Sequence, residues 1–331
     1  MTERVAIGVV GVGHLGALHT KMLAASTTAT LVGVYDVDGA KAARVATEFG
    51  TKAFASLDEL LEKAEAVTIA TTTIAHHATA KKALGQGKHL FIEKPITHTV
   101  GEADELCRLA REGGRIIQVG HIERFNPAIL ALDRYTINPM FVESHRLAQF
   151  NPRGTDVAVV LDLMIHDIDI ILSFVRAPVT RIDANGVAVV SDSVDIANAR
   201  LQFANGCVAN VTASRISQKK MRKMRLFQRN EYIAIDFSEG TAEVFRLLEG
   251  DAPDMPGTMM LGELGAGKNK RTIVYEQPEV KDVNALQYEL NLFAKTIREQ
   301  GTPVVSGEDG RRALEVAQGI LDTIQRQTVQ L

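Results

Sequence analysis

The largely apolar stretch Thr155–Phe174, which is expected to form one long helix, contains Asp162, His166 and Asp169. Asp162, His166 and Asp169 are spaced i, i+4 and i+7, which places them on one helix face. Burying two carboxylates and an imidazole without partners would cost several kcal/mol. They therefore either satisfy one another and nearby groups or line a wet cavity, where an imidazole can act as a general base near neutral pH.

A lysine follows the short apolar run His89–Ile92, in the sequence Glu93-Lys94-Pro95. Ligands of open α/β sheets bind beside the carboxyl ends of the strands, which is where Lys94 falls. Pro95 stiffens the turn and favours an extended backbone at Lys94. Taken alone, a lysine at a strand end is more often a solvated charge than a binding or catalytic residue.

A glycine-rich turn, Gly11-Val12-Gly13-His14-Leu15-Gly16, follows the apolar run Val5–Val10 and opens a predicted helix. In such a turn the first glycine permits the tight bend and the second lets the backbone approach a pyrophosphate. The third lets helix and strand lie close together. Because glycine turns are common, a turn without a ligand is the alternative interpretation.

Asp36 lies 20 residues beyond Gly16, at the end of the second apolar run. An acidic side chain there accepts hydrogen bonds from the adenosine ribose and repels a 2′-phosphate. Val37 and Asp38 follow it, not a basic residue. The pattern therefore predicts NAD in preference to NADP.

The elements that must position these residues alternate in the first 120 residues. Five near-continuous apolar runs are expected to be strands: Val5–Val10, Leu31–Tyr35, Ala66–Ala70, His89–Ile92 and Ile116–Val119. Helical stretches fill the gaps between them: Gly16–Ala25, Gly39–Phe49, Leu57–Lys63, Ala75–Gly85 and Val100–Glu112. This alternation predicts a doubly wound parallel sheet with helices on both faces.

Beyond about residue 121 the chain reads as β-like segments at short spacing, which predicts an antiparallel or mixed sheet. Asn185-Gly186 and Asn205-Gly206 are turn signals, and Gly250–Lys270 is expected to be a loop. Two helices end the chain, near Val283–Glu299 and Gly307–Arg326. We therefore expect an NAD-binding Rossmann domain over 1–121 and a substrate-binding and oligomerisation domain over 122–331. The alternative is that the last helices lie against the first domain.

Composition narrows the class of protein. The length of 331 residues is typical of a globular protein with two domains. The chain has 37 Lys plus Arg and 40 Asp plus Glu, so its net charge is −3, which argues against general nucleic-acid binding. Cys107 and Cys207 form no disulfide framework, which favours a cytoplasmic setting. No targeting signal is evident, and no apolar run reaches the roughly 18 residues of a membrane span.

These features together resemble the Gfo/Idh/MocA family of oxidoreductases. The resemblance rests on the glycine turn, Asp36, the segment Gly87–Pro95, and Asp162 with His166, and it covers nearly the whole chain. It implies a Rossmann domain followed by an α/β domain whose large open sheet, mixed and mostly antiparallel, commonly forms the interface of a homodimer or homotetramer. It also implies NAD(P)-dependent oxidation of a sugar or cyclitol hydroxyl, without a metal.

The resemblance also assigns roles by position. His76 matches a family histidine near the cofactor, and Thr71 and Thr72 match the loop that flanks the dinucleotide. Thr72 and Thr73 stand where the family usually has proline and asparagine. Glu93 and Lys94 complete the set expected at the cofactor, together with residues of the glycine turn and the second strand: Gly11, Gly13, His14, Leu15, Gly16, Asp36 and Val37.

Lys94, Asp162 and His166 are the expected catalytic residues. Histidine has an unperturbed pKa of about 6.5, so His166 is expected to take the hydroxyl proton. The unperturbed pKa of lysine is about 10.4, so its surroundings would have to lower that pKa before it could act as the base. Lys94 would then hold the oxygen, and Asp162 would bind the substrate and orient its neighbours. The division between the two basic groups stays open.

The segment Gly120–Ala128 resembles the subgroup of the family that oxidises UDP-N-acetylglucosamine at its 3-hydroxyl, on the way to a 3-amino lipid A precursor. His121, Arg124 and Asn126 are its candidate substrate ligands, and a structural loop is the alternative. The basic cluster Arg215–Arg225 is expected to be mainly a solvated face or a subunit contact. Its first residue, Arg215, is the best placed to reach a pyrophosphate.

Several alternatives remain. Asp162, His166 and Asp169 could in principle bind a divalent metal, although no further ligand lies at suitable spacing. The segment 262–269 nearly fits a phosphate-binding loop, but Asn269 stands where a hydroxyl is needed, so a loop is expected. The function could also be oxidation of a free sugar or inositol, or that of a non-catalytic NAD-binding sensor.

Overall fold

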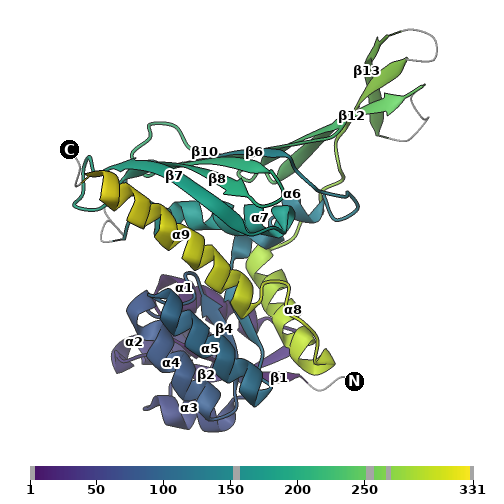
Figure 1. Ribbon diagram of the computed structural model, residues 1–331. Coiled ribbons are helices and arrows are strands. Elements are labelled where there is room, and N and C mark those ends of the chain that lie inside the picture. The colour runs from purple at the N-terminus through teal and green to yellow at the C-terminus, as the bar shows by residue number, and fades with distance from the viewer. Residues whose placement is uncertain (1–3, 152–156, 251–256, 266–269, 329–331) are drawn as a thin grey trace. The chain divides into compact units, whose positions relative to one another are not determined.

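The computed structural model describes residues 4–151, 157–250, 257–265 and 270–328 (Figure 1). The chain divides into two compact units, residues 1–125 with 284–315 and residues 126–283 with 316–331. Helix α8 (Ala285–Glu299) and residues 307–315 of α9 (Gly307–Thr328) thus belong to the first unit. A single cut after residue 121 would instead group both helices with the second unit.

The first unit contains the predicted parallel sheet, with strand order β2-β1-β3-β4-β5. Its strands are β1 (Val5–Val10), β2 (Ala29–Tyr35), β3 (Ala66–Ile69), β4 (His89–Glu93) and β5 (Ile117–Gly120). Its helices are α1 (His14–Ala24), α2 (Gly39–Glu48), α3 (Leu57–Lys63), α4 (Thr73–Gly85), α5 (Val100–Gly113) and the short 3-10 helix η1 (Ile122–Phe125). The doubly wound fold is confirmed.

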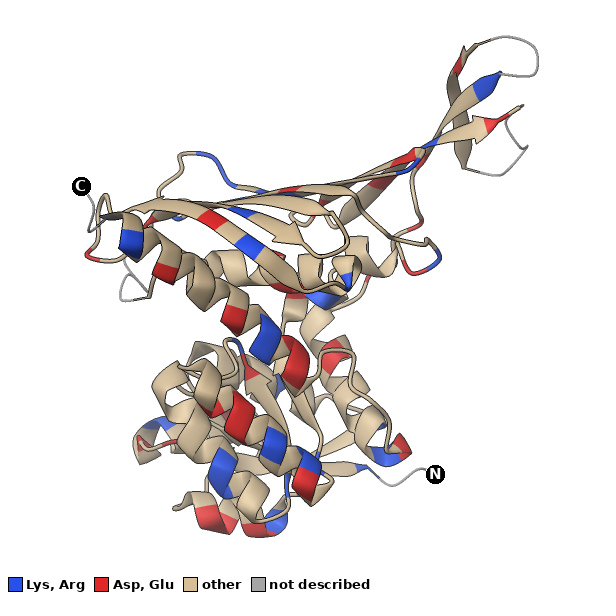
Figure 2. Cartoon of the chain, in the orientation of Figure 1, with Lys and Arg blue, Asp and Glu red and all other residues tan. Residues whose placement is uncertain are grey.

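The two faces of this sheet are covered by different helices. Side chains of α1, α2 and α8 share one buried apolar cluster with Ile7 and Val9 of β1. Gly8 points the other way, and a Cβ there would lie 2.7 Å from Leu60 of α3, so α3 covers the opposite face. Figure 2 shows charges of both signs interspersed over the outer surfaces of α3, α4 and α5, as expected for solvated helix faces.

Helix α8 joins the first unit because its apolar stripe completes that cluster. Leu290, Phe293 and Ala294 are buried there, and the Phe293 ring meets the ring of Phe91 on β4 edge to face, with 5.8 Å between centroids. The chain after α8 then runs beside β5, where Val119 N–H donates to the Val305 carbonyl (3.0 Å).

The second unit is built on a nine-stranded sheet with order β13-β14-β12-β11-β10-β6-β9-β8-β7. Neighbouring strands are antiparallel except for the parallel pair β6–β9, which confirms the predicted mixed, mostly antiparallel sheet. Its strands are β6 (Phe141–Leu147), β7 (Val179–Val187), β8 (Ile196–Phe203), β9 (Val208–Ser214), β10 (Met221–Gln228), β11 (Glu231–Asp236), β12 (Thr241–Glu249), β13 (Thr258–Leu264) and β14 (Arg271–Glu276).

Two helical segments lie on one face of this sheet (Figure 1): the short α6 (Pro127–Leu130) and the pair formed by η2 (Val160–Met164) and α7 (Ile165–Val175). The expected helix over 155–174 is therefore not regular, and its first two residues lie outside the described part of the chain. Segment η2 is a π-helix, whose hydrogen bonds span i to i+5, so Asp162 and His166 do not have α-helical spacing.

Two local expectations were wrong. Asn185-Gly186 is not a turn but lies within β7, paired with Asn198 and Ala197 of β8. Gly250–Lys270 is not all loop, since it contains β13; residues 251–256 and 266–269 lie outside the described part. By contrast, Asn205-Gly206 does form the β8–β9 turn, with Gly206 in the left-handed region (φ +87°). Within the described chain, no helix is long and apolar enough to span a bilayer.

Candidate active site

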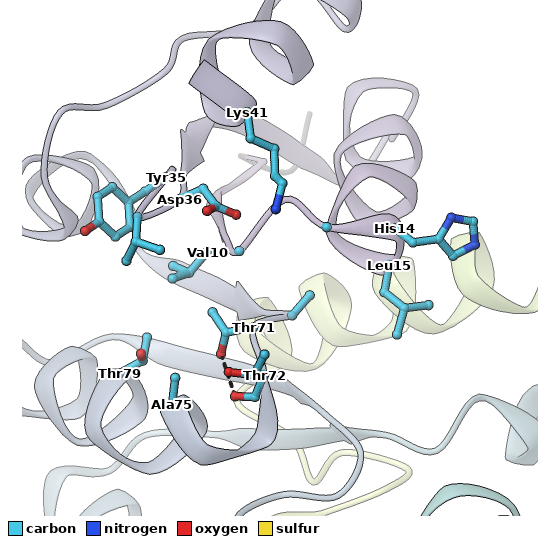
Figure 3. A pocket seen from close by; sticks show the side chains of 14 residues that line it. Val10, His14, Leu15, Tyr35, Asp36, Lys41, Thr71, Thr72, Ala75 and Thr79 are labelled. Carbon is cyan, nitrogen blue, oxygen red and sulfur yellow. Dashed lines mark hydrogen bonds between the residues drawn. The ribbon is translucent and has the colours of Figure 1, made fainter. Parts of the chain in front are cut away.

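A cavity of about 470 Å³ opens at the carboxyl ends of β1 and β2 (Figure 3). It is lined by the glycine turn and by residues of β2, α2 and the start of α4: Val10, Gly11, Gly13, His14, Leu15, Tyr35, Asp36, Val37, Lys41, Ala70, Thr71, Thr72, Ala75 and Thr79. Most of the residues expected at a dinucleotide are therefore gathered around one cavity.

The glycines of the turn each have a steric reason. Gly11 has φ +82°, and a Cβ there would lie 2.7 Å from Thr71. A Cβ on Gly16 would lie 1.8 Å from the Gly11 carbonyl oxygen, so only glycine lets α1 approach the turn. At Gly13 a Cβ would meet no protein atom within 4 Å, so its backbone is open to a ligand. The turn thus fits a pyrophosphate at the α1 N-terminus.

Asp36 is held in place by backbone donors. Its Oδ2 accepts from the Val12 N–H (2.8 Å) and its Oδ1 from the Asp38 N–H (2.9 Å). The carboxylate therefore links the end of β2 to the glycine turn and faces the cavity, where ribose hydroxyls are the natural additional donors. The residues present fit an adenine dinucleotide.

His76 stands behind the cavity wall and does not line it. Its Nδ1 lies 3.0 Å from the Pro95 carbonyl oxygen and its Nε2 3.2 Å from the Thr71 carbonyl oxygen. Burial lowers the pKa of His76 despite these two carbonyls, so the ring is neutral near pH 7 and donates to one of them. His76 therefore ties the Thr71 loop to the Lys94-Pro95 turn.

Glu93 is also buried away from the cavity, in a pair that the sequence did not reveal. His19 Nε2 lies 2.8 Å from Glu93 Oε1, and Lys94 N–H donates to Glu93 Oε2 (3.3 Å). Burial raises the pKa of Glu93, but the hydrogen bond and charge of His19, with the charge of Lys94, lower it overall. A buried carboxylate thus stands directly beside half-buried Lys94 at the end of β4.

The helical segment of the second unit carries the other expected catalytic residues. Asp162 lies in η2 and is half-buried, as is His166 at the second position of α7, while Asp169 is fully buried. Sequence reasoning missed Asp167, which pairs with Arg146 of β6 through two hydrogen bonds of 3.0 and 2.9 Å. This pair fixes α7 against the sheet and so positions His166.

The three candidate substrate ligands after β5 differ in their burial and in their contacts. His121 is buried, and Arg124 is half-buried on η1. Asn126 caps α6, because its Oδ1 accepts from Ala128 N–H (3.1 Å) and its Nδ2 donates to the Phe237 carbonyl (3.1 Å). Its amide therefore has a structural task whatever else it contacts.

The basic cluster Arg215–Arg225 is mostly engaged by the second unit itself. The buried Arg215 guanidinium contacts the Val157 carbonyl and lies 3.7 Å from Asp195. Lys223 and Arg225 pair across strands with acidic residues of β11 and β6. Among the described residues, no group of three or more His, Cys, Asp or Glu could hold a metal ion. Of the segment 262–269, residues 262–264 belong to β13, and residues 266–269 lie outside the described part of the chain.

Two family models match the chain in succession. Residues 5–121 match "Oxidoreductase family, NAD-binding Rossmann fold" and residues 139–243 match "GFO/IDH/MocA C-terminal domain". UDP-N-acetylglucosamine 3-dehydrogenase from Acidithiobacillus ferrooxidans is 37% identical over 311 residues, 94% of each chain. scyllo-Inositol 2-dehydrogenase (NAD(+)) from Bacillus subtilis is 31% identical over 66% of this chain and 69% of its own.

Solved structures agree with these sequence relations. The structure of the Acidithiobacillus ferrooxidans enzyme, GnnA, has a TM-score of 0.88 at 36% identity and covers 98% of this chain and 99% of its own. Both units of the fold are therefore those of a full-length relative. From the successive matches to its two domains and the full-length relative, we conclude that the chain belongs to the Gfo/Idh/MocA family of oxidoreductases.

Proposed function

We propose that this protein oxidises a secondary hydroxyl of a nucleotide sugar with NAD, and that the substrate is UDP-N-acetylglucosamine, converted to its 3-keto form. The observation that carries the proposal is the 37% identity to a UDP-N-acetylglucosamine 3-dehydrogenase over 94% of both chains. The 3-keto product is a suitable substrate for amination to a 3-amino sugar of the lipid A precursor type.

The cofactor part of the proposal rests on the cavity at the glycine turn. The turn at Gly11 and Gly13 would hold the pyrophosphate, with Gly16 letting α1 approach it, and Asp36 would hold the adenosine ribose, which favours NAD. Thr71 and Thr72, on the opposite wall in Figure 3, would flank the dinucleotide. When bound, the nicotinamide supplies the hydride acceptor.

The chain's own residues would handle the proton and the charge. His166 takes the proton of the substrate hydroxyl, because an imidazole is a competent base near neutral pH. The Lys94 ammonium holds the same oxygen and stabilises the negative charge that develops on it. The carboxylate of buried Glu93 accepts a hydrogen bond from the Lys94 N–H, which helps to hold the lysine at the end of β4. Asp162 binds a neighbouring hydroxyl.

Substrate contacts are proposed for Arg124 and His121 in the loop after β5. An arginine fork suits a sugar phosphate. Asn126 and Arg215 would contribute mainly by holding their loops, because Asn126 caps α6 and Arg215 contacts the Val157 carbonyl. Both cysteines are free, which is compatible with the expected cytoplasmic setting. Burial raises the pKa of Cys107 to about 12 and of Cys207 to about 11, so neither thiol is reactive.

The second candidate function is oxidation of a free inositol or sugar, favoured by the 31% identity to scyllo-inositol 2-dehydrogenase. The test is a panel of UDP-N-acetylglucosamine, UDP-glucose, N-acetylglucosamine and scyllo- and myo-inositol with NAD, following the absorbance of the reduced cofactor. We expect turnover of UDP-N-acetylglucosamine only. Reduction of the product with borodeuteride, followed by mass spectrometry, locates the oxidised carbon.

UDP alone separates the two candidates independently of turnover. A nucleotide-sugar site should bind UDP and raise the melting temperature, whereas an inositol site should not. Turnover of an inositol without stabilisation by UDP would overturn the proposal. No turnover of any compound, with NAD still bound, would favour the non-catalytic sensor.

A further inference from the structure

Lys41 lines the cavity but belongs to none of the sequence motifs. It is the third residue of α2, half-buried, and lines the cavity with Asp36 and Val37. Its backbone N–H donates to Asp38 Oδ1 (3.0 Å), which fixes the start of the helix. Figure 3 shows the side chain reaching over the glycine turn, with its ammonium directed into the cavity near Asp36.

The charge of this ammonium is not used by the protein itself. Over the described ranges, Lys41 forms neither an ion pair nor a side-chain hydrogen bond. Lys81 and Lys82 of the same unit, by contrast, pair with carboxylates. A half-buried cation that faces a ligand cavity without a protein counter-ion is suited to an anionic group of the ligand.

Asp36 is less repulsive to such an anion than its charge alone suggests. Both of its oxygens already accept backbone N–H bonds, from Val12 and Asp38, and these donors offset part of its charge. Lys41 stands beside it, and the N-terminus of the ten-residue helix α2 adds positive potential on the same side. Asp38 is the other acidic group nearby, and its Oδ1 is occupied as the helix cap.

We propose that Lys41 makes this cavity a binding site for NADP as well as NAD, with the ammonium binding the 2′-phosphate on the adenosine ribose. The inference rests on the dinucleotide part of the proposed function and is independent of its sugar substrate. Asp36 still opposes the phosphate, so NAD remains the better ligand. Position 41 thus sets the ratio between the two cofactors.

The test compares 5′-ADP with 2′,5′-ADP, which differ only in the 2′-phosphate, by calorimetry on the whole protein without any sugar. Wild type, Lys41→Ala and the control Lys63→Ala are measured; Lys63 is an exposed residue of α3 outside the cavity. We expect Lys41→Ala to weaken 2′,5′-ADP about tenfold or more and to leave 5′-ADP unchanged, because one charge-assisted contact is lost. Added salt should weaken 2′,5′-ADP binding more in wild type than in Lys41→Ala.

Three results would overturn the proposal. Wild type and Lys41→Ala could bind 2′,5′-ADP equally, wild type could bind 5′-ADP but not 2′,5′-ADP, or Lys41→Ala could weaken both ligands alike. The last result would assign the ammonium to the pyrophosphate. Because these binding measurements contain no sugar, they test Lys41 even if the protein does not oxidise UDP-N-acetylglucosamine. Matching Kd measurements with NADP and NAD extend the comparison to the intact cofactors.

Discussion

Lys94 and His166 have different tasks in the proposed reaction, so their variants should fail differently. We expect Lys94→Ala and His166→Asn each to lower kcat/KM about a thousandfold while NAD affinity stays unchanged. Wild-type kcat/KM should rise with pH as the base loses its proton, and this acid limb should vanish only in His166→Asn. Lys88→Ala, just before β4, is the matched control. Near-normal turnover of Lys94→Ala, or an acid limb that persists in His166→Asn, would contradict the assignment.

His76 makes a separate prediction about stability and pH. Burial lowers its folded pKa, so between the unfolded value, about 6.5, and the lower folded value the unfolded chain binds more protons. The stability that neutral His76 contributes is therefore complete above about pH 6.5 and is lost as the pH falls below it. His76→Gln should be less stable at pH 7.5 but lose less stability between pH 7.5 and pH 5.5, as measured by urea unfolding. Parallel losses in both proteins would show that His76 does not titrate in this window.

Among the elements, α7 is joined to β6 by a buried ion pair. The side chains of Arg146 and Asp167 are 3% and 2% exposed, and removing one partner of such a pair leaves an uncompensated charge. Asp167→Ala should therefore lower the free energy of unfolding by about 3–5 kcal/mol, whereas Asp183→Ala, in the exposed pair Arg181–Asp183, should cost less than about 1 kcal/mol. The double variant Arg146→Met/Asp167→Leu should recover most of the loss in urea unfolding. Equal, small costs for both single variants would exclude this role.

Elements were predictable from sequence where burial produces a pattern. The buried strands β1, β3 and β4 appear as apolar runs, and the glycine turn and Asp36 were found because their chemistry depends on close spacing. Strand β13 was missed because it is an exposed edge strand, paired only with β14, so no buried side marks it. The π-helix η2 was missed because its residues read as ordinary helix.

Contacts between residues far apart in sequence account for the rest of the site. His19 and Glu93 are 74 positions apart, and Arg146 and Asp167 are 21 apart. Each pair exists only because two elements are adjacent in the fold, so neither has a spacing that the sequence displays. Lys41 was missed for a different reason: it lies five positions after Asp36, outside the glycine-turn and strand-end pattern, and only the first turn of α2 brings it back to the cavity.

At the scale of the whole molecule, one row of side chains marks the face of the large sheet opposite α7. Strand register aligns Met259, Tyr275, Phe245, Tyr232, Phe227 and Phe141 across β13, β14, β12, β11, β10 and β6. The five aromatic rings follow one another at 5.0–5.8 Å between centroids. Arg146 of β6 points to the opposite face from Phe141 and bonds Asp167 of α7. A continuous apolar row with exposed members such as Phe227 and Met259 is typical of an interface between subunits.

We expect a second copy of this chain to cover that row, giving a homodimer or homotetramer in solution. Phe227 lies in the row between Tyr232 and Phe141 and is 36% exposed, so a charge there is tolerated by the isolated chain but is buried without a partner in the assembly. Phe227→Glu should therefore shift the mass measured by light scattering from a multiple of the chain mass to that of one chain, with an unchanged circular dichroism spectrum. Val304→Glu, which places the same charge at an exposed apolar residue of the first unit, should keep the wild-type mass. A wild-type protein with the mass of one chain, or a Phe227→Glu protein that stays assembled, would show that copies of the chain do not meet through this face.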